Sequence, residues 1–600
     1  MRASCRSARA ARRVGKLGGA AAVVSWAAVA LGCSAELRRF PLRDPVWVDE
    51  DLRAVSVPCR PDPEEPKEQI CRPEEYESPF MWDVADKTVF RPITKFFAAD
   101  MGFEARNVNA VDEVPDSSWF TNRIGVHPMS EDEIASGSCG EQGIATAPHT
   151  PGAWLIDLGK ANGANPGFRV DIEGVGKFML KADGAGEGEK PTGATAIASR
   201  LYHAAGWWTV CDTVVYVDPS WLKLKAGLQF SDNTGTKQPF DEGKLKGILD
   251  AAQKRGGLVR MVASTWLKGR TIGPFRYEGT RDDDPNDIVP HEDRRDLRGA
   301  RVMAAWLAHF DSREQNTMTT WQALDPKAKD SSPGRTTHWY IDLGDCFGSH
   351  WEFESINRRI NHSYYFDPGD VAIDLLTLGT FERPWDNTVH NTELPMFDYF
   401  RPDFAPEEWK GGYPNPAFAR MTERDAAWGA RILSRFTDAN VAAAVRVGDY
   451  TEPRASEFLT QTLLQRRDAI LTRWFSKLSP VSDVTLDGDR LCAVDLARRT
   501  KIWPTTSFTY EATLRSGADL ELERPVAVTA DQDGNVCLDL PRVATDASAK
   551  RDDATRYAVL DITNGVAKGP LRVHMYDLGP TEHHRLVAIQ RPDGPDAAVR

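Results

Sequence analysis

The hydrophobic residues of the chain follow three successive patterns, which predict a β-rich region, a helical region and a second β-rich region. Between residues 151 and 267, short apolar runs are separated by Gly-rich and polar stretches, which is typical of β-strands. Between residues 268 and 478, apolar residues mostly return every three or four positions, the spacing of amphipathic helices. From residue 479, short strand-like runs return, separated by turn pairs such as Asp487-Gly488 and Asn564-Gly565.

These patterns predict individual elements and an α+β fold. In the first two regions we expect strands at residues 154–156, 168–172, 177–181, 211–217 and 258–267, and helices at residues 192–205, 297–308 and 455–474. In the last region, strands at residues 507–514, 520–529, 557–562, 571–576 and 586–590 predict a small antiparallel β-sandwich. We expect five parts: a signal segment (1–32), an N-terminal tether and extension (33–150), a β-rich lobe (151–267), a helical lobe (268–478) and the β-sandwich (479–600).

The first 33 residues have the features of an export signal. Five arginines and one lysine precede an apolar run at residues 17–31, which is too short for a comfortable membrane span. The run ends in Ala30-Leu31-Gly32-Cys33, which resembles the lipobox of bacterial lipoproteins. The resemblance implies removal of residues 1–32 and a lipid on Cys33. The protein would then be anchored to a bacterial membrane in the cell envelope, periplasmic or surface-exposed. A short membrane anchor or an ordinary secretory signal is the alternative.

Charge and cysteine content narrow the function classes. The formal net charge of −13, without a dense stripe of Lys and Arg, argues against a nucleic-acid partner. Cys59 and Cys71 bracket a short loop, and Cys492 and Cys537 lie in one predicted domain, so both pairs are disulfide candidates in an oxidising compartment. The cysteines at positions 139, 211 and 346 have no evident partner.

The candidate chemistry lies between residues 302 and 348. One apolar run leads to His309, Asp311 follows two residues later, and Asn316 follows five residues after that. A second apolar run leads into Asp342-Leu343-Gly344. This order, H-x-D-x4-N, strand, D-L-G, resembles the catalytic half of the protein-kinase-like superfamily. It looks closest to the atypical branches, the phosphoinositide-kinase-like, bacterial toxin and secretory-pathway kinases. Each motif alone is common by chance, so the interpretation depends on their order and spacing.

The resemblance implies a bilobal kinase-like core with a β-rich N-lobe (151–267) and a helical C-lobe (268–478). On it, Asp311 is the catalytic base or orients the acceptor hydroxyl. Asn316 and Asp342 hold Mg²⁺ or Mn²⁺ against the phosphates of ATP, because these hard cations prefer oxygen ligands. Lys181, at the end of a strand that precedes a helix, contacts the phosphates.

The chain departs from the kinase pattern at two points. The Gly-rich loop after Gly159 lacks the G-x-G-x-x-G spacing, and an ordinary hairpin turn is its alternative. The expected helix at 192–205 contains no Asp or Glu that could pair with Lys181, and the nearest acids are Glu187 and Glu189 in the preceding loop. The alternative interpretation of Lys181 is that it is an exposed lysine at the end of a strand, without a role in binding.

The expected function is phosphoryl or nucleotidyl transfer from a metal-bound nucleotide to a protein or small-molecule acceptor. One alternative is a catalytically inactive pseudokinase that binds a partner, and another is a structural lipoprotein of the envelope. A serine hydrolase has little support, since the chain has no G-x-S-x-G.

Overall fold

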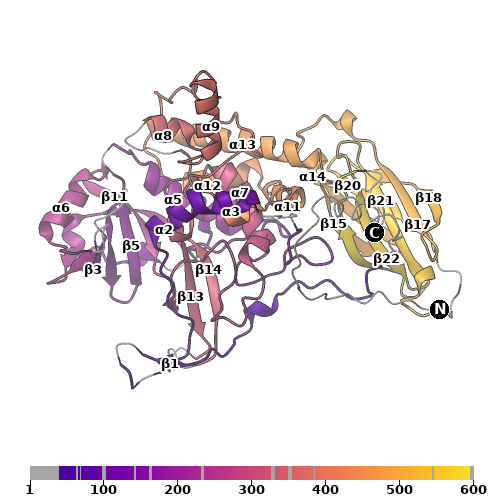
Figure 1. Cartoon of the computed structure of the whole chain (residues 1–600), viewed down its shortest axis with the longest axis horizontal. Coiled ribbons are helices and arrows are strands. Elements are labelled where there is room, and N and C mark those ends of the chain that lie inside the picture. The colour runs from indigo at the N-terminus through magenta and orange to yellow at the C-terminus, as the bar shows by residue number, and fades with distance from the viewer. Residues whose placement is uncertain are drawn as a thin grey trace, which may run out of the picture.

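The computed structural model describes residues 39–594, apart from 63–64, 68, 98–102, 141–142, 161–164, 185, 232–235, 326, 328–331, 349–353, 384, 544–545 and 547. The predicted signal segment (1–32) and Cys33 lie outside the described residues. The described chain is an α+β protein in which the β-rich region, the helical region and the C-terminal sheets lie side by side along the long axis (Figure 1). None of its described helices is both long and apolar enough to cross a membrane.

The β-rich region is a mainly antiparallel sheet with helices on both faces, in which only the described β3–β7 pair is parallel. Among the described residues its strands run in the order β10-β11-β5-β4-β3-β7, and β6 also pairs with β11. Helix α6 contributes Leu245, Ile248 and Leu249 to the core on one face, and α5 packs on the other. The elements are β3 (Trp154–Lys160), β4 (Gly167–Ile172), β5 (Gly176–Ala182), α5 (Lys190–Ala205), β6 (Asp212–Val217), η4 (Pro219–Trp221), β7 (Leu222–Leu224), β8 (Gln229–Ser231), β9 (Lys237–Pro239), α6 (Glu242–Ala251), β10 (Lys254–Arg255) and β11 (Leu258–Thr265).

The helical region shares one hydrophobic core with α5. Helices α7 and α11 approach each other closely at Gly299, which has no side chain. A Cβ at this position would lie only 2.7 Å from the Trp428 ring. The elements are β12 (Arg270–Thr271), η5 (His291–Asp293), α7 (Arg295–Leu307), η6 (Glu314–Asn316), β13 (Thr317–Ala323), β14 (Gly334–Tyr340), α8 (Glu354–Arg359), α9 (Pro368–Thr377), η8 (Pro395–Phe397), α10 (Pro416–Ala419), α11 (Glu423–Leu433), α12 (Asp438–Arg446) and α13 (Pro453–Phe475). Of the sheet β12-β13-β14, the sequence indicated only the end of β14, as the apolar run before Asp342; β12 and β13 were missed.

The C-terminal region consists of two antiparallel sheets that share a hydrophobic core. One sheet has the order β15-β16-β20-β19 and the other β18-β17-β21-β22-β23. The predicted strand at 507–514 was placed too early, because residues Thr505–Ser507 form a short helix and the strand begins at Glu511. The elements are β15 (Val481–Asp487), β16 (Arg490–Asp495), α14 (Leu496–Arg499), η9 (Thr505–Ser507), β17 (Glu511–Ser516), β18 (Leu522–Val526), β19 (Thr529–Ala530), β20 (Asn535–Asp539), η10 (Ala554–Arg556), β21 (Tyr557–Thr563), β22 (Leu571–Asp577) and β23 (His584–Gln590).

The N-terminal segment, expected as a tether, makes specific contacts along the core from residue 40 onward. Phe40 accepts a hydrogen bond at its carbonyl from the Tyr576 hydroxyl (2.9 Å), and the buried Asp51 carboxylate accepts from the Ser118 hydroxyl (2.7 Å). Its elements are η1 (Glu50–Leu52), β1 (Arg60–Pro61), β2 (Gln69–Ile70), α2 (Phe80–Ala85), η2 (Asp86–Phe90), α3 (Arg91–Phe97), α4 (Glu131–Ser136) and η3 (Ile144–Thr146).

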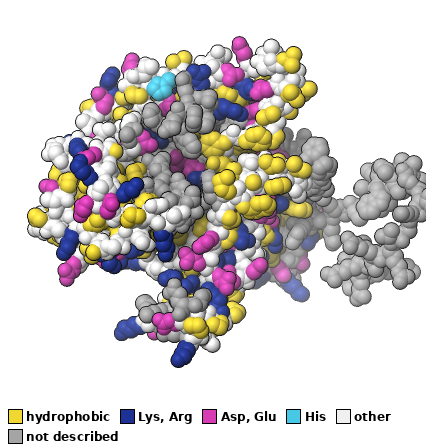
Figure 2. All heavy atoms as spheres, turned by 60° about the vertical axis from the view of Figure 1, so that its left-hand side comes forward, with side chains coloured by type: hydrophobic (Ala, Val, Ile, Leu, Met, Phe, Trp, Pro, Cys, Tyr) yellow, Lys and Arg dark blue, Asp and Glu magenta, His cyan; other side chains and the backbone are white. Residues whose placement is uncertain are grey.

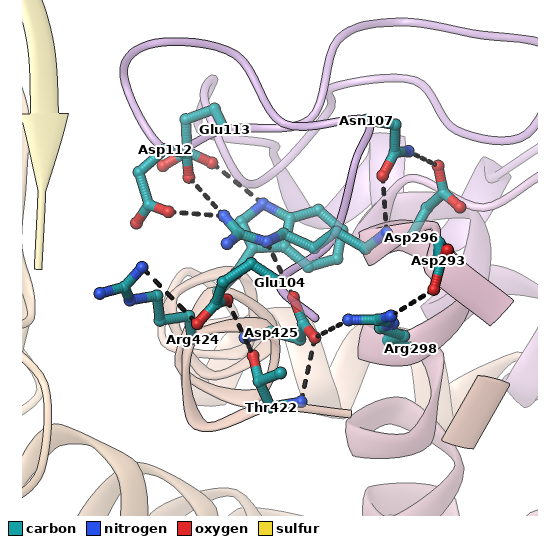
Figure 3. A network of polar contacts seen from close by, with 12 residues as sticks. Glu104, Asn107, Asp112, Glu113, Asp293, Asp296, Arg298, Thr422, Arg424 and Asp425 are labelled. Carbon is teal, nitrogen blue, oxygen red and sulfur yellow. Dashed lines mark hydrogen bonds and ion pairs between the residues drawn. The ribbon is translucent and has the colours of Figure 1, made fainter. Parts of the chain in front are cut away.

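A polar network joins this extension to the helices (Figure 3). Asn107 accepts from the Arg295 backbone N–H and donates to Asp296, each over 2.7 Å. Asp112 pairs with Arg295 (2.6 Å), and Arg298 pairs with Asp293 (2.8 Å). The extension is therefore part of the folded core.

Hydrophobic side chains stay exposed on two helical segments. Met81, Trp82 and Phe90 are exposed on the segment from α2 to η2, and Leu375 and Leu376 on α9. Figure 2 shows hydrophobic side chains gathered in broad areas on one face of the molecule. Contiguous exposed apolar area of this kind is typical of surface that contacts another molecule.

Candidate functional site

The ends of strands β5 and β14 bring Lys181 and Asp342 together. Lys181 is the penultimate residue of β5, and Asp342 follows β14 by two residues with a positive φ of 56°. The Lys181 Nζ lies 2.6 Å from Asp342 Oδ1, and the Nζ of Lys160, the last residue of β3, lies 3.9 Å from Asp342 Oδ2. Two cations from the sheet therefore meet one carboxylate from the helical region.

The charges of this group shift each other's pKa. Burial alone would raise the pKa of Asp342, but Lys181 and Lys160 outweigh it and hold that pKa well below its usual range. The charge of Lys181, together with burial, lowers the pKa of Lys160 to about 8, although Asp342 opposes the shift. Asp342 is therefore ionised at neutral pH, and Lys160 loses its proton at a lower pH than an ordinary lysine.

The loop after α7 fixes Asp311 and Asn316 against each other. Helix α7 ends where Ala308 adopts a left-handed conformation with φ 53°. The Asn316 side-chain amide donates to Asp311 Oδ2 (2.9 Å), and Arg313 Nε pairs with Asp311 Oδ1 (2.8 Å). Burial raises the pKa of the Asp311 carboxyl, an effect that Arg313 opposes and Asp345 strengthens.

The β13–β14 hairpin brings this loop to the Asp342 turn. Thr317 is opposite Tyr340 in the hairpin, and the Ile341 N–H donates to the Asn316 carbonyl (3.1 Å). Asn316 and Asp342 therefore lie at the same end of the hairpin. The Asn316 amide N–H groups are directed to Asp311, which leaves its amide oxygen, with the Asp342 carboxylate, as the oxygen ligands that Mg²⁺ prefers.

A cavity of about 240 Å³ opens beside these charges, between the sheet and the helical region. Met179 and Leu267 line it from the sheet side, and Met318 and Ile341 from the other. Lys160, Lys181 and Asp342 also line it. Leu267 lies just beyond β11, in the segment that leads into the helical region. The cavity is thus an apolar slot with a charged group in its wall.

The acids nearest to α5 in the sequence do not pair with Lys181. Glu189 accepts from the backbone N–H of Thr451 (2.6 Å), and Glu187 accepts from the backbone N–H of Gly184 (2.6 Å). Besides Asp342, the charge of Lys181 also affects the buried Asp212, the first residue of β6. Burial raises the Asp212 pKa to about 6, while a hydrogen bond from Ser264 and the Lys181 charge oppose the shift. Sequence reasoning missed Lys160 and Asp212, because no motif marks either position.

A second polar group adjoins the loop that carries Asp311, whose backbone N–H donates to Asp345. Donor atoms of His309, Asp345 and Cys346 lie within 4.8 Å of one another, with His309 Nε2 3.7 Å from Asp345 Oδ1. The Tyr202 hydroxyl lies 3.0 Å from His309 Nδ1. Nitrogen and sulfur donors suit a softer ion such as Zn²⁺ better than Mg²⁺. This set offers three ligands, one fewer than a closed structural zinc site needs.

Three disulfides are present among the described residues. Cys59–Cys71 and Cys492–Cys537 are the pairs expected from the sequence. The third, Cys139–Cys211, joins residues 72 positions apart, so spacing gave no indication of it. Cys346 is buried and free.

Comparison with protein-family models, with curated proteins and with solved structures finds no match. Of the four residues that the motifs singled out, the structure pairs Lys181 with Asp342 and Asp311 with Asn316. Lys181 and Asp342 line the cavity, and the hairpin places Asn316 beside Ile341, which also lines it. A function has to be argued from this site, since a fold alone supports many chemistries.

Proposed function

We propose that the protein is a bilobal, kinase-like phosphotransferase that binds a nucleoside triphosphate between its β-rich and helical lobes. The observation that carries the proposal is the Lys181–Asp342 pair, 2.6 Å apart, in the wall of an apolar cavity between the two regions. The element order supports it, because the Lys181 strand is followed by α5 and then by β11, which leads into the helical region.

Each part of the site has a role in such a reaction. The apolar slot between Met179 and Met318 suits a flat base, and the Lys160 and Lys181 ammonium groups suit phosphate oxygens. Asp342 and the Asn316 amide oxygen fit a Mg²⁺ or Mn²⁺ ion, because one is ionised and the other is left free by its N–H contacts. That ion, when bound, would neutralise charge on the phosphates.

Asp311 is the residue that accepts a proton from the acceptor hydroxyl in this proposal. Its raised pKa brings it closer to neutral pH, where a general base works most efficiently. Asn316 and Arg313 each hold one carboxylate oxygen, so the group keeps one orientation. Phosphoryl transfer depends mainly on such positioning and on charge stabilisation.

A pseudokinase that binds nucleotide or a partner without turnover is the second candidate. The observation in its favour is that Lys181 contacts Asp342 directly, while no acid of α5 is available to hold the lysine. The expected export and lipid anchor remain predictions from residues 1–33. The three disulfides agree with an oxidising compartment.

The test is a thermal-shift titration of the protein with ATP and Mg²⁺ or Mn²⁺. Ligand at about 100 times its Kd stabilises the folded state by about 2.7 kcal/mol. We expect a metal-dependent rise of the midpoint that Asp342→Ala abolishes. Asp311→Asn should keep the rise and lose phosphoryl transfer. Asp539→Asn, at an exposed position in β20, is the matched control.

The outcomes separate the candidates. A metal-dependent shift without transfer to any acceptor supports the pseudokinase. No shift at millimolar ATP, with both proteins folded, would refute nucleotide binding and favour a structural envelope protein.

A further inference from the structure

A second cavity, of about 390 Å³, lies on the helical region beside the loop that carries Asp311. His362, Tyr364, Trp385 and Tyr413 line it, with Arg301 and Lys410. Trp409 and Tyr413 lie close together in the sequence but differ in burial. Trp409 is buried in the core, but Tyr413 is only partly buried and contributes to this cavity.

The aromatic side chains of this cavity combine flat faces with available polar groups. His362 and Trp385 are stacked with ring centroids 5.5 Å apart, and Arg383 lies 5.7 Å from the centroid of Trp385. Among the described residues, no hydrogen-bond partner is found for the His362 ring nitrogens, the Trp385 indole N–H, or the hydroxyls of Tyr364 and Tyr413. Within the part of the chain that the structure describes, these side chains therefore keep donors and acceptors available beside aromatic rings.

Charged side chains in the wall are held in fixed positions. Lys410 Nζ pairs with Asp367 (2.7 Å) and lies 5.1 Å from the centroid of the Tyr364 ring. Arg301 donates to the backbone carbonyls of Glu407 (2.7 Å) and Trp409 (3.0 Å). A ligand would meet this surface with little side-chain ordering left to do, which favours affinity.

The cavity wall is bonded directly to the Asp311 loop. The Gly412 N–H donates to the carbonyl of Phe310 (2.6 Å), the residue before Asp311. Asn415 Nδ2 donates to the carbonyl of Ser312 (3.2 Å), the residue after it. The Arg313 guanidinium, which pairs with Asp311, lies 5.3 Å from the centroid of the Tyr413 ring. The cavity therefore lies directly beside the loop that carries Asp311.

We propose that this cavity binds a carbohydrate and that one hydroxyl group of the sugar is the phosphoryl acceptor; this inference rests on the proposed function. The C–H groups of a sugar ring are attracted to the negative faces of aromatic rings. Its hydroxyl groups match side chains that both donate and accept hydrogen bonds. None of the described lining residues lies in a β-strand, so the cavity gives a peptide acceptor no strand edge to pair with.

The reaction balances with a nucleoside triphosphate as co-substrate. The sugar hydroxyl oxygen forms a bond to the γ-phosphorus, and the bond from that phosphorus to the β–γ bridging oxygen breaks. The hydroxyl proton passes to the Asp311 carboxylate. The products are a sugar phosphate and a nucleoside diphosphate.

Saturation-transfer NMR on the full chain without nucleotide tests the binding. The probes are the methyl glycosides of glucose, galactose, mannose and N-acetylglucosamine. We expect saturation transfer to at least one glycoside, and a loss of affinity of about tenfold in Trp385→Ala, because one stacking face is lost. Trp385→Phe should restore most of the affinity. Trp47→Ala removes an exposed tryptophan outside the cavity and should leave binding unchanged.

The outcomes keep this inference apart from the nucleotide proposal. Absence of transfer to all four glycosides in a folded protein overturns the sugar site, whatever ATP does in the thermal-shift titration. Binding that Trp385→Ala and Tyr413→Ala both leave unchanged overturns the assignment to this cavity. If a glycoside binds there and ATP also binds, ³¹P NMR should show a sugar phosphate that Asp311→Asn does not form, and its absence in the unaltered protein overturns the acceptor role.

Discussion

Lys160, Lys181 and Asp342 lie together in the wall of the proposed nucleotide site. The repulsion between the two lysines changes the pKa of Lys160. Lys181 is the main reason why the pKa of Lys160 falls to about 8, with burial second. A lysine with a lowered pKa loses its charge at lower pH, so it stops attracting phosphate above that pH. Lys181→Met removes the repulsion and should return the Lys160 pKa toward that of an ordinary lysine.

We expect the affinity for ATP to fall as the pH rises through 8, by up to about tenfold per pH unit. In Lys181→Met the binding is weaker throughout, and the fall should move to higher pH. Isothermal titration between pH 6.5 and 9.5 measures both effects. Lys160→Gln should remove the pH dependence. A pH profile that is the same in Lys160→Gln and in the unaltered protein would contradict the assignment.

At the scale of single residues, the candidate site residues could be predicted from their order in the sequence, but their contacts could not. Lys181, Asp311, Asn316 and Asp342 could be chosen because their spacing resembles a known motif. Lys160 and Asp212 could not, since each is an isolated charge whose meaning depends on strand pairing. Asp345 and Cys346 follow the Asp342 turn directly, and only the folded turn brings them to His309.

At the scale of elements, the Cys139–Cys211 disulfide joins the extension to the start of β6. It closes a loop across 72 positions, for which the chain-entropy relation gives a stabilisation of about 4 kcal/mol. We expect Cys139→Ser/Cys211→Ser to lower the free energy of unfolding by up to this amount. Denaturant unfolding with and without a reducing agent measures the change.

The matched control is Cys59→Ser/Cys71→Ser, whose sequence separation is only 12. The same relation gives about 3 kcal/mol for this shorter loop, so its loss should cost less. Equal losses for the two pairs would show that loop entropy does not control the effect, and that packing around Cys211 matters more.

The predicted elements that match the structure best are those with a strong hydrophobic period. The helices expected at 192–205 and 455–474 appear at Lys190–Ala205 and Pro453–Phe475, because their apolar faces repeat regularly. Strand β13 was missed, because its sequence TMTTWQA is mostly polar. Thr319 and Thr320 are nevertheless buried, and Thr320 accepts a hydrogen bond from Trp339. From the sequence alone, such a run of threonines predicts a loop, although the threonines are buried in a strand.

At the scale of the whole molecule, one carboxylate joins three regions. Asp112, in the N-terminal extension, pairs with Arg295 of α7 (2.6 Å), Arg431 of α11 (3.4 Å) and Arg591, which follows the last strand of the C-terminal sheets (3.1 Å). Figure 3 shows Asp112 within the polar network on α7 and α11. Burial alone would raise the pKa of Asp112, but the three arginines outweigh it and hold that pKa well below its usual range.

Asp112→Asn tests whether this carboxylate couples the regions. Asp112 has a positive φ of 63°, a conformation that Asn tolerates well, so the substitution removes the charge without straining the backbone. Arg295 keeps Asp425 and Arg431 keeps Glu113 as ion-pair partners, but the buried Arg591 loses its carboxylate, so we expect a destabilisation of about 3 kcal/mol. Calorimetry should then show the C-terminal sheets unfolding separately from the rest. The exposed Asp539→Asn should change stability by less than about 0.5 kcal/mol.

The contribution of Asp112 to the free energy of unfolding should decrease as the pH is lowered. Because the folded-state pKa of Asp112 is depressed, its contribution is fully present above the unfolded value near 4 and is lost as the pH falls through the lower folded value. The difference in stability between the unaltered protein and Asp112→Asn should therefore be constant from pH 5 to 8 and shrink on acidification. A difference that grows below pH 4 would mean that Asp112 is not the residue that holds the arginines together.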